Sequence, residues 1–189
     1  YQREFDRMQP GLKQPDAYKY MQEMLPALKA LWAGDYEHNG EYWSFPTATS
    51  VPKPVQKPHP PLWIAARSPV TFDYAIANNC NIISWPLTRP FDEAELYKRQ
   101  LDEAIAKAPG CKQQLFAMMR HTALYENKSG HDSAIRALQT SMGCFENLFR
   151  NFGDVVNGFP KQIPLDELVE REQYDPKMLE ENLMFGSPD

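Results

Sequence analysis

A group of polar residues follows a short apolar run near the middle of the chain. Residues 62–66 are apolar, and Arg67, Ser68 and Thr71 come directly after them. Ser68 followed by Pro69 is typical of a helix start, where unpaired backbone N–H groups and the helix dipole favour an anion. With the charge of Arg67 and two hydroxyls one helical turn apart, this pattern predicts a phosphate site. The alternative is that Ser68 only caps the helix and Arg67 pairs with a surface carboxylate.

Two further strand ends carry side chains suited to chemistry. Trp85 lies near the end of the apolar run 81–87, and Arg120 and His121 lie late in the run 114–125. The Trp85 indole would either form a wall for an aromatic ligand or fill the core. Arg120 and His121 must point to opposite faces of a strand, so one of them would face the interior of a barrel. Which one does so stays open, as does a purely structural role for His121.

The composition excludes several classes of partner. The chain has 189 residues, of which 42% are hydrophobic and 24% are charged, as in a single globular domain. Its net charge of −5 disfavours nucleic acid as a partner, because nucleic-acid binding requires a basic patch. No segment approaches the roughly 18 apolar residues of a membrane span, and the first residues do not begin a signal peptide. We therefore expect neither nucleic acid nor a membrane as partner.

The cysteines and histidines indicate no metal site. Cys80, Cys111 and Cys144 are widely spaced and form no CxxC pair, which predicts three buried thiols in a reducing cytoplasm. The four histidines show no spacing typical of metal ligands. We therefore predict a cytoplasmic protein without a bound metal.

The first third of the chain predicts a helix followed by a hairpin and a connector. Apolar residues recur at helical spacing from Asp16, the expected N-cap, to Gly34, and Pro26 should kink or split this helix. Asn39–Gly40 between aromatic residues predicts a hairpin turn. The proline-rich segment 51–61 predicts an extended connector into the next strand.

The rest of the chain alternates between strands and helices. The apolar runs predict parallel strands buried on both faces, and the periodic segments between them predict helices. This order predicts right-handed βαβ units, that is, an α/β fold with helices outside a parallel sheet. The expected strands are 62–66, 81–87 and 114–125, the expected helices are 69–79, 90–108 and 129–152, and short helical turns are expected over 165–181.

Both ends of the chain indicate a piece of a longer protein. The chain does not begin with Met, and Ser187–Pro188 near its end is typical of a helix start. Three strands cannot close an eight-stranded barrel. If the architecture is a barrel, most of it would therefore lie outside these residues.

Several segments, in the right order, resemble the bacterial luciferase-like flavin monooxygenases. They are YQREF at the start, GEYWSFP, PKPVQKPHPPLWIAARSPVTFDYAIANNCNIISWPL and the closing LMFGSPD. The resemblance implies part of a (β/α)8 TIM-type barrel, roughly strands 5 to 7 with their helices. Residues 1–189 would then be one incomplete barrel domain, with four strands before residue 1 and the last strand after residue 189. Residues 1–5 would be the loop after the fourth strand.

The resemblance also implies a cofactor and its site. The family binds FMN, reduced by a partner reductase, and uses O₂ to oxidise an organic substrate. Its phosphate-binding stretch falls on Ala66, Arg67, Ser68 and Thr71, and Trp85 matches an aromatic residue near the flavin ring. The family often has a carboxylate where Arg67 stands, so the role of the Arg67 side chain stays open. No catalytic residue is assigned.

Two alternatives share the same fold. One is a hydride-transfer oxidoreductase that uses the deazaflavin F420 without oxygen, and the other is a non-catalytic flavin-binding protein. We expect the complete protein to act on a small molecule and to form a homo-oligomer. The isolated 189 residues are expected to be inactive and to expose unpaired strand edges.

Overall fold

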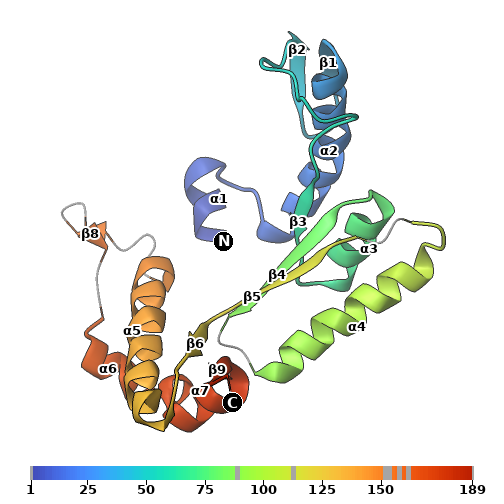
Figure 1. The fold of residues 1–189 in the computed structure, drawn as a ribbon. Helices are drawn as coiled ribbons and strands as arrows, with labels where there is room; N and C mark the ends of the chain where they lie inside the picture. Colours follow the sequence, from blue (N-terminus) through green and yellow to red (C-terminus); the bar gives the residue numbers. More distant parts are fainter. Residues whose placement is uncertain are drawn as a thin grey trace. The chain divides into compact units, whose positions relative to one another are not determined.

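The computed structural model describes residues 2–87, 90–111, 114–150, 155–156, 159–160 and 163–188. The chain divides into two compact units, Tyr1–Pro61 and Leu62–Asp189. Figure 1 shows the helices and strands of both units, coloured along the chain from blue to red. The expectation of one incomplete barrel domain stays a prediction.

The first unit is built on one long helix. Helix α1 (Gln2–Met8) and the 3-10 turn η1 (Gln14–Asp16) precede α2 (Ala17–Ala33). Helix α2 continues through Pro26, so of the two expected effects of this residue the split is wrong, and the kink stays a prediction. Leu25 and Ala27 on either side of the proline are buried, and their packing outweighs the donor that proline lacks.

Helix α1 corrects a second expectation. The start of the chain, expected to be a loop, is helical from Gln2 onward, and Tyr1 lies outside the described residues. The Gln2 side-chain amide donates to Asp6 at 2.8 Å and to the Leu12 carbonyl at 2.9 Å. The Gln9 N–H donates to the Phe5 carbonyl at 2.8 Å. These local hydrogen bonds stabilise a helix turn that the resemblance did not anticipate.

The predicted hairpin follows α2. Strands β1 (Tyr36–Asn39) and β2 (Ser44–Ala48) pair antiparallel, with Asn39 opposite Ser44, so the turn is the loop 40–43. The Glu23 carboxylate of α2 binds this loop through the backbone N–H groups of residues 41–43 and through His38 Nε2 at 2.9 Å. Burial by itself raises the pKa of the Glu23 carboxyl, but the hydrogen bonds from His38 and the loop outweigh it and lower this pKa.

The second unit contains the predicted parallel sheet. Strands β3 (Trp63–Ala65), β4 (Asn81–Leu87) and β5 (Phe116–Arg120) lie in that order and are all parallel. Helix α3 (Pro69–Ala77) connects β3 to β4, and α4 (Phe91–Lys107) lies in the connection from β4 to β5. The strand and helix order of βαβ units is therefore confirmed. Figure 1 shows α3 and α4 running alongside this sheet.

Among the described residues, helices cover one face of the sheet. Ile64, Ile82 and Phe72 of α3 are buried, and the Phe72 ring lies 6.1 Å from that of Phe116 in β5. The opposite face, within the described part of this unit, is open, and Trp63 on it is 46% exposed. The expectation that the first strand is buried on both faces is therefore wrong for these residues, because the described helices cover a single side.

The third predicted strand is divided in two at His121. Strand β5 ends at Arg120 and pairs with β4, whereas β6 (Thr122–Leu124) pairs parallel with β9 (Met184–Gly186). The chain thus changes partner strand across one residue. The sequence does not reveal such a change, because the residues on both sides of His121 favour strand equally.

The remainder of the second unit is mostly helical. Its hydrophobic core contains Ile135, Leu138 and Met142 of α5, together with Leu168 of α6 and Leu179 of α7. The predicted long helix is confirmed to residue 150, and residues 151–152 lie outside the described part. Ser187 and Pro188, the expected helix start, have no regular secondary structure, and residue 189 lies outside the described part. The elements are α5 (His131–Arg150), β7 (Val155–Val156), β8 (Phe159–Pro160), α6 (Leu165–Val169) and α7 (Pro176–Asn182), with 3-10 turns η2 (Lys128–Gly130) and η3 (Glu172–Tyr174).

Candidate cofactor site

The backbone after β3 is fixed by the neighbouring strand. The Ala66 N–H donates to the Ile83 carbonyl at 3.0 Å, and the Ala66 carbonyl accepts from the Ser84 hydroxyl at 2.6 Å. Ala66 and Ser84 are both buried. A buried hydroxyl with a partner is stable, whereas loss of that partner would leave a costly unsatisfied group. The strand end that begins the candidate site is therefore rigidly placed.

Ser68 and Thr71 lie together at the start of α3. Ser68 occupies the N-cap position, but its hydroxyl does not bond to the helix backbone. It lies 3.1 Å from the Thr71 hydroxyl, and both side chains are in the first turn. The simple capping role, weighed as an alternative for Ser68, is therefore absent. Two neighbouring hydroxyls instead face solvent at a helix N-terminus, where the dipole favours negative charge.

The backbone donors at this helix start are fewer than the sequence suggests. Pro69 has no N–H, and the N–H groups of Thr71 and Phe72 donate to the Ser68 carbonyl at 3.0 and 3.2 Å. An anion at this position would therefore depend on the two hydroxyls more than on the helix amides.

Arg67 turns toward helix α4. Its Nε donates to the Tyr97 hydroxyl at 3.0 Å, and its Nη2 donates to Glu93 Oε1 at 3.2 Å. The Tyr97 hydroxyl donates to the same Glu93 oxygen at 2.5 Å. Arg67 therefore pairs with a carboxylate, as the alternative interpretation of this residue expected.

These contacts shift two acid–base equilibria. The hydrogen bond to Tyr97 is the main cause of a raised pKa of the Arg67 guanidinium; burial opposes it, and the contacts with Glu93 add smaller increases. Burial, together with the bond to Glu93, raises the pKa of the Tyr97 phenol. Tyr97 therefore stays protonated and Arg67 stays charged across the physiological range.

Trp85 lies on the open face of the sheet. Along β4, Ile82, Ser84 and Pro86 are buried, so Trp85 shares the other face with Ile83 and is half-buried. Since Ile83 is opposite Ala65, Trp85 lies two residues farther toward the edge at which β3 ends. Trp85 is therefore at the same carboxyl edge as Ala66, Arg67 and Ser68, where parallel α/β folds bind their ligands.

Arg120 and His121 end the third strand of the sheet. Arg120 Nη2 donates to the Asn182 carbonyl at the end of α7. The His121 ring meets Phe145 edge to face at a centroid distance of 5.5 Å, and its Nε2 is buried with no hydrogen-bond partner among the described residues. Burial lowers the pKa of His121, so its ring is neutral at pH 7.

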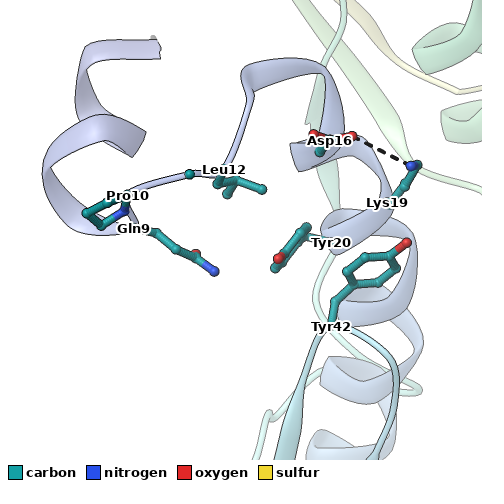
Figure 2. Close-up of a pocket in the computed structure, with 8 residues that line it drawn as sticks. Gln9, Pro10, Leu12, Asp16, Lys19, Tyr20 and Tyr42 are labelled. Atoms are coloured by element: carbon teal, nitrogen blue, oxygen red, sulfur yellow. Dashed lines mark ion pairs between the residues drawn. The ribbon is translucent and has the colours of Figure 1, made fainter.

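A hollow that the sequence did not indicate lies in the first unit. It has a volume of about 380 Å³. Figure 2 shows Gln9 and Leu12 on one side of it and Tyr20 and Tyr42 on the other. The rings of Tyr20 and Tyr42 are 4.6 Å apart. None of the predicted cofactor-binding residues lines it, and only the tyrosines beside the hairpin could have pointed to it. The lining residues are Gln9, Pro10, Gly11, Leu12, Asp16, Lys19, Tyr20 and Tyr42.

The cysteines differ from expectation in burial. All three are thiols outside any disulfide, but Cys80 alone is buried, whereas Cys111 is half-buried and Cys144 is exposed. In the described ranges, no three His, Cys, Asp or Glu side chains converge on a point where a metal ion would fit. Nor does any helix there combine the length and the apolar character of a membrane span.

The sequence matches one protein family along almost its whole length. The model of the luciferase-like monooxygenases matches residues 1–181. The oxygenase component of a flavin-dependent trigonelline monooxygenase from Acinetobacter baylyi is 33% identical over 186 residues, which are 98% of this chain and 52% of that protein. An FMNH₂-dependent dimethylsulfone monooxygenase from Pseudomonas putida is 31% identical over 53% of this chain and 26% of its own.

Solved structures agree with this match at the level of the fold. The FMN complex of the oxygenating part of a type II Baeyer–Villiger monooxygenase, 3,6-diketocamphane monooxygenase from Pseudomonas putida, aligns with a TM-score of 0.56 and 13% identity. The alignment covers 99% of this chain and 61% of that one. An F420-dependent secondary alcohol dehydrogenase aligns with a TM-score of 0.61 and 15% identity, over 97% of this chain and 52% of that one.

Proposed function

Because the chain belongs to the luciferase-like monooxygenase family, we propose that the complete protein is a flavin-dependent monooxygenase that uses reduced FMN and O₂ to oxidise an organic substrate. The observation that carries this proposal is the match over residues 1–181, together with relatives named for flavin-dependent oxygenation. The chain spans about half the length of the first of these relatives and a quarter of the second. The α/β fold of the chain is that of part of the family's barrel.

The residues at the carboxyl edge of the sheet suit the FMN phosphate. The hydroxyls of Ser68 and Thr71 lie 3.1 Å apart at a helix N-terminus and could both donate to one phosphate group. Ala66 fixes the strand end from which this turn begins. Trp85, half-buried at the same edge, would lie beside the flavin ring.

Each residue would have a separate task with the cofactor bound. Reduced FMN would supply the electrons that activate O₂. Ser68 and Thr71 would hold its phosphate end, and Trp85 would limit access of water to its ring. The cofactor would thereby be oriented by groups on two adjacent strands, which is how α/β folds commonly position a ligand.

The setting of the protein is part of the same proposal. The Acinetobacter relative is described as an oxygenase component, which supports a separate flavin reductase as partner. Three cysteines outside any disulfide support a cytoplasmic location. We include a homo-oligomer of the complete protein and a small-molecule substrate in this proposal.

The test is anaerobic titration of the complete protein with reduced FMN, followed by oxygen uptake with a reductase and candidate substrates. We expect micromolar binding and substrate-dependent transfer of an oxygen atom from ¹⁸O₂ to the product. Absence of binding at about 100 μM reduced FMN, a level that corresponds to only weak affinity, would overturn the proposal. Binding without turnover of any substrate would favour the non-catalytic alternative.

One observation favours a second cofactor. The F420-dependent dehydrogenase aligns with this chain about as well as the FMN-binding structure does. F420 would transfer hydride without oxygen, and it also carries a phosphate-containing side chain. The same titration with F420 decides between the cofactors, because a monooxygenase should bind FMN at least about tenfold more tightly, a difference of about 1.4 kcal/mol.

A further inference from the structure

Arg67 is the single residue between two fixed points of the backbone. On its N-terminal side, Ala66 is held by Ile83 and by the buried Ser84 hydroxyl. On its C-terminal side, the Ser68 carbonyl accepts the first hydrogen bonds of α3. The backbone conformation at Arg67 therefore determines the direction in which α3 leaves the sheet. This direction in turn determines where the Ser68 and Thr71 hydroxyls lie.

The partners of Arg67 are suited to fixing that direction. Tyr97 is only 2% exposed, and its ring lies 6.3 Å from that of Phe72 in α3. Its hydroxyl accepts from Arg67 and donates to Glu93, so the three side chains close a ring of hydrogen bonds. A guanidinium delivers two donors in fixed directions, whereas a lysine ammonium cannot reach both partners in the same way.

The charge of Arg67 is already matched in this arrangement. Glu93 is mostly buried, with a side chain 20% exposed, and Arg67 is half-exposed beside it. Moving Arg67 to a phosphate would leave the Glu93 carboxylate without its cation in a poorly hydrated position, which is costly. The side chain therefore serves the site better where it is than as a direct ligand.

We propose that Arg67 is a positioning residue, which Tyr97 and Glu93 hold so that the β3–α3 turn presents Ser68 and Thr71 to the phosphate of FMN, and that Arg67 does not bind this phosphate. The inference rests on the proposed FMN site. It goes beyond that proposal because it assigns roles to Tyr97 and Glu93, two residues of α4 outside the phosphate-binding stretch.

The test compares FMN with riboflavin, which lacks the phosphate, in the complete protein. Tyr97→Phe removes one hydroxyl, and we expect it to weaken FMN about tenfold while riboflavin changes less than about twofold. Arg67→Lys should lose as much as Arg67→Met, because charge alone does not restore the two-donor geometry. Without ligand, amide hydrogen exchange of residues 66–71 should be faster in Tyr97→Phe.

The variants have matched controls. Tyr36→Phe removes a hydroxyl that contacts His38 in the first unit, and Glu95→Gln removes an exposed carboxylate two residues from Glu93. Both should leave the ratio of FMN to riboflavin affinity unchanged. Glu93→Gln should likewise weaken FMN and leave riboflavin nearly unchanged. It replaces Tyr97→Phe in the test if the tyrosine variant does not fold.

Other outcomes would overturn the inference in distinguishable ways. If Arg67→Met weakens FMN while Tyr97→Phe does not, or if Arg67→Lys restores binding, Arg67 acts on the phosphate directly. If the losses of Arg67→Met and Tyr97→Phe simply add in the double variant, the two residues do not act together. Equal losses for both ligands would indicate general packing. If the parent protein does not bind FMN more tightly than riboflavin, that result contradicts both the proposed phosphate site and this inference.

Discussion

At the scale of single residues, the turn between β3 and α3 carries side chains of two kinds, the hydroxyls of Ser68 and Thr71 and the guanidinium of Arg67. Ser68 and Thr71 have hydroxyls that contact each other and solvent, whereas Arg67 is engaged by Glu93 and Tyr97. A phosphate needs donors that are available without breaking another strong contact. The hydroxyls meet that condition, whereas Nε and Nη2 of Arg67 already donate to Tyr97 and Glu93.

The hydroxyl pair leads to a direct prediction for the complete protein. Ser68→Ala and Thr71→Ala should each weaken FMN, because each removes a charge-assisted hydrogen bond of about 1.5–3 kcal/mol. Riboflavin affinity should be unchanged, since the phosphate is absent. Flavin fluorescence titration measures both affinities. Thr140→Ala, which removes an exposed hydroxyl on α5, is the control. Equal weakening of both flavins would place the phosphate elsewhere.

At the scale of elements, local patterns predicted the strand and helix order well but failed where a contact distant in sequence decides the outcome. The strand 81–87 and the helix near 91–107 follow from their own residues, because periodicity and apolar runs are local signals. The division at His121 depends on β9, about 60 residues later, so no local pattern contains it. The hydrogen bond from Arg67 to Tyr97 joins residues 30 positions apart, so no local pattern predicts it either.

A histidine links two helices of the second unit and should make its stability depend on pH. His131 at the start of α5 contacts Asp132 at 3.0 Å and Glu180 of α7 at 2.7 Å. The hydrogen bond to Asp132, followed by that to Glu180, raises the pKa of His131 above its ordinary 6.5. The contribution is therefore complete below about pH 6.5 and is lost as the pH rises through the higher folded-state value.

Thermal unfolding from pH 5.5 to 8.5 measures this contribution. The difference in Tm between the parent and His131→Gln should be largest at the acid end and should shrink toward pH 8.5. His121 has the opposite effect, because its lowered pKa removes stability as the pH falls below about 6.5, but it is present in both proteins and cancels in the difference. A Tm difference that grows with pH would contradict the assignment.

At the scale of the whole molecule, the family resemblance supplied what the local patterns could not. The order of strands and helices in βαβ units is compatible with many α/β folds. A phosphate site at a helix start is likewise compatible with many phosphate-containing ligands. The segment around PHPPLWIAARSP reduced the possible folds and the possible ligands to those of the luciferase-like monooxygenases. The family match over residues 1–181 bears out this identification. The site residues themselves stay predictions, since a strand-end cluster with suitable chemistry is not yet a bound cofactor.

The open face of the β3–β4–β5 sheet yields a prediction for the isolated chain. Trp63 of β3 and Met119 of β5, the two outer strands, both lie on that face and are 46% and 49% exposed. Apolar surface of this kind, next to strand edges, favours association between copies. We expect residues 1–189 alone to self-associate and to bind FMN only weakly, as measured by light scattering after size exclusion and by flavin titration. Trp63→Lys with Met119→Lys should reduce the association, because both changes charge the open face. A parent chain that is monomeric, melts in one sharp transition and binds FMN at micromolar concentration would contradict this expectation, since the described residues would then be sufficient for the cofactor site.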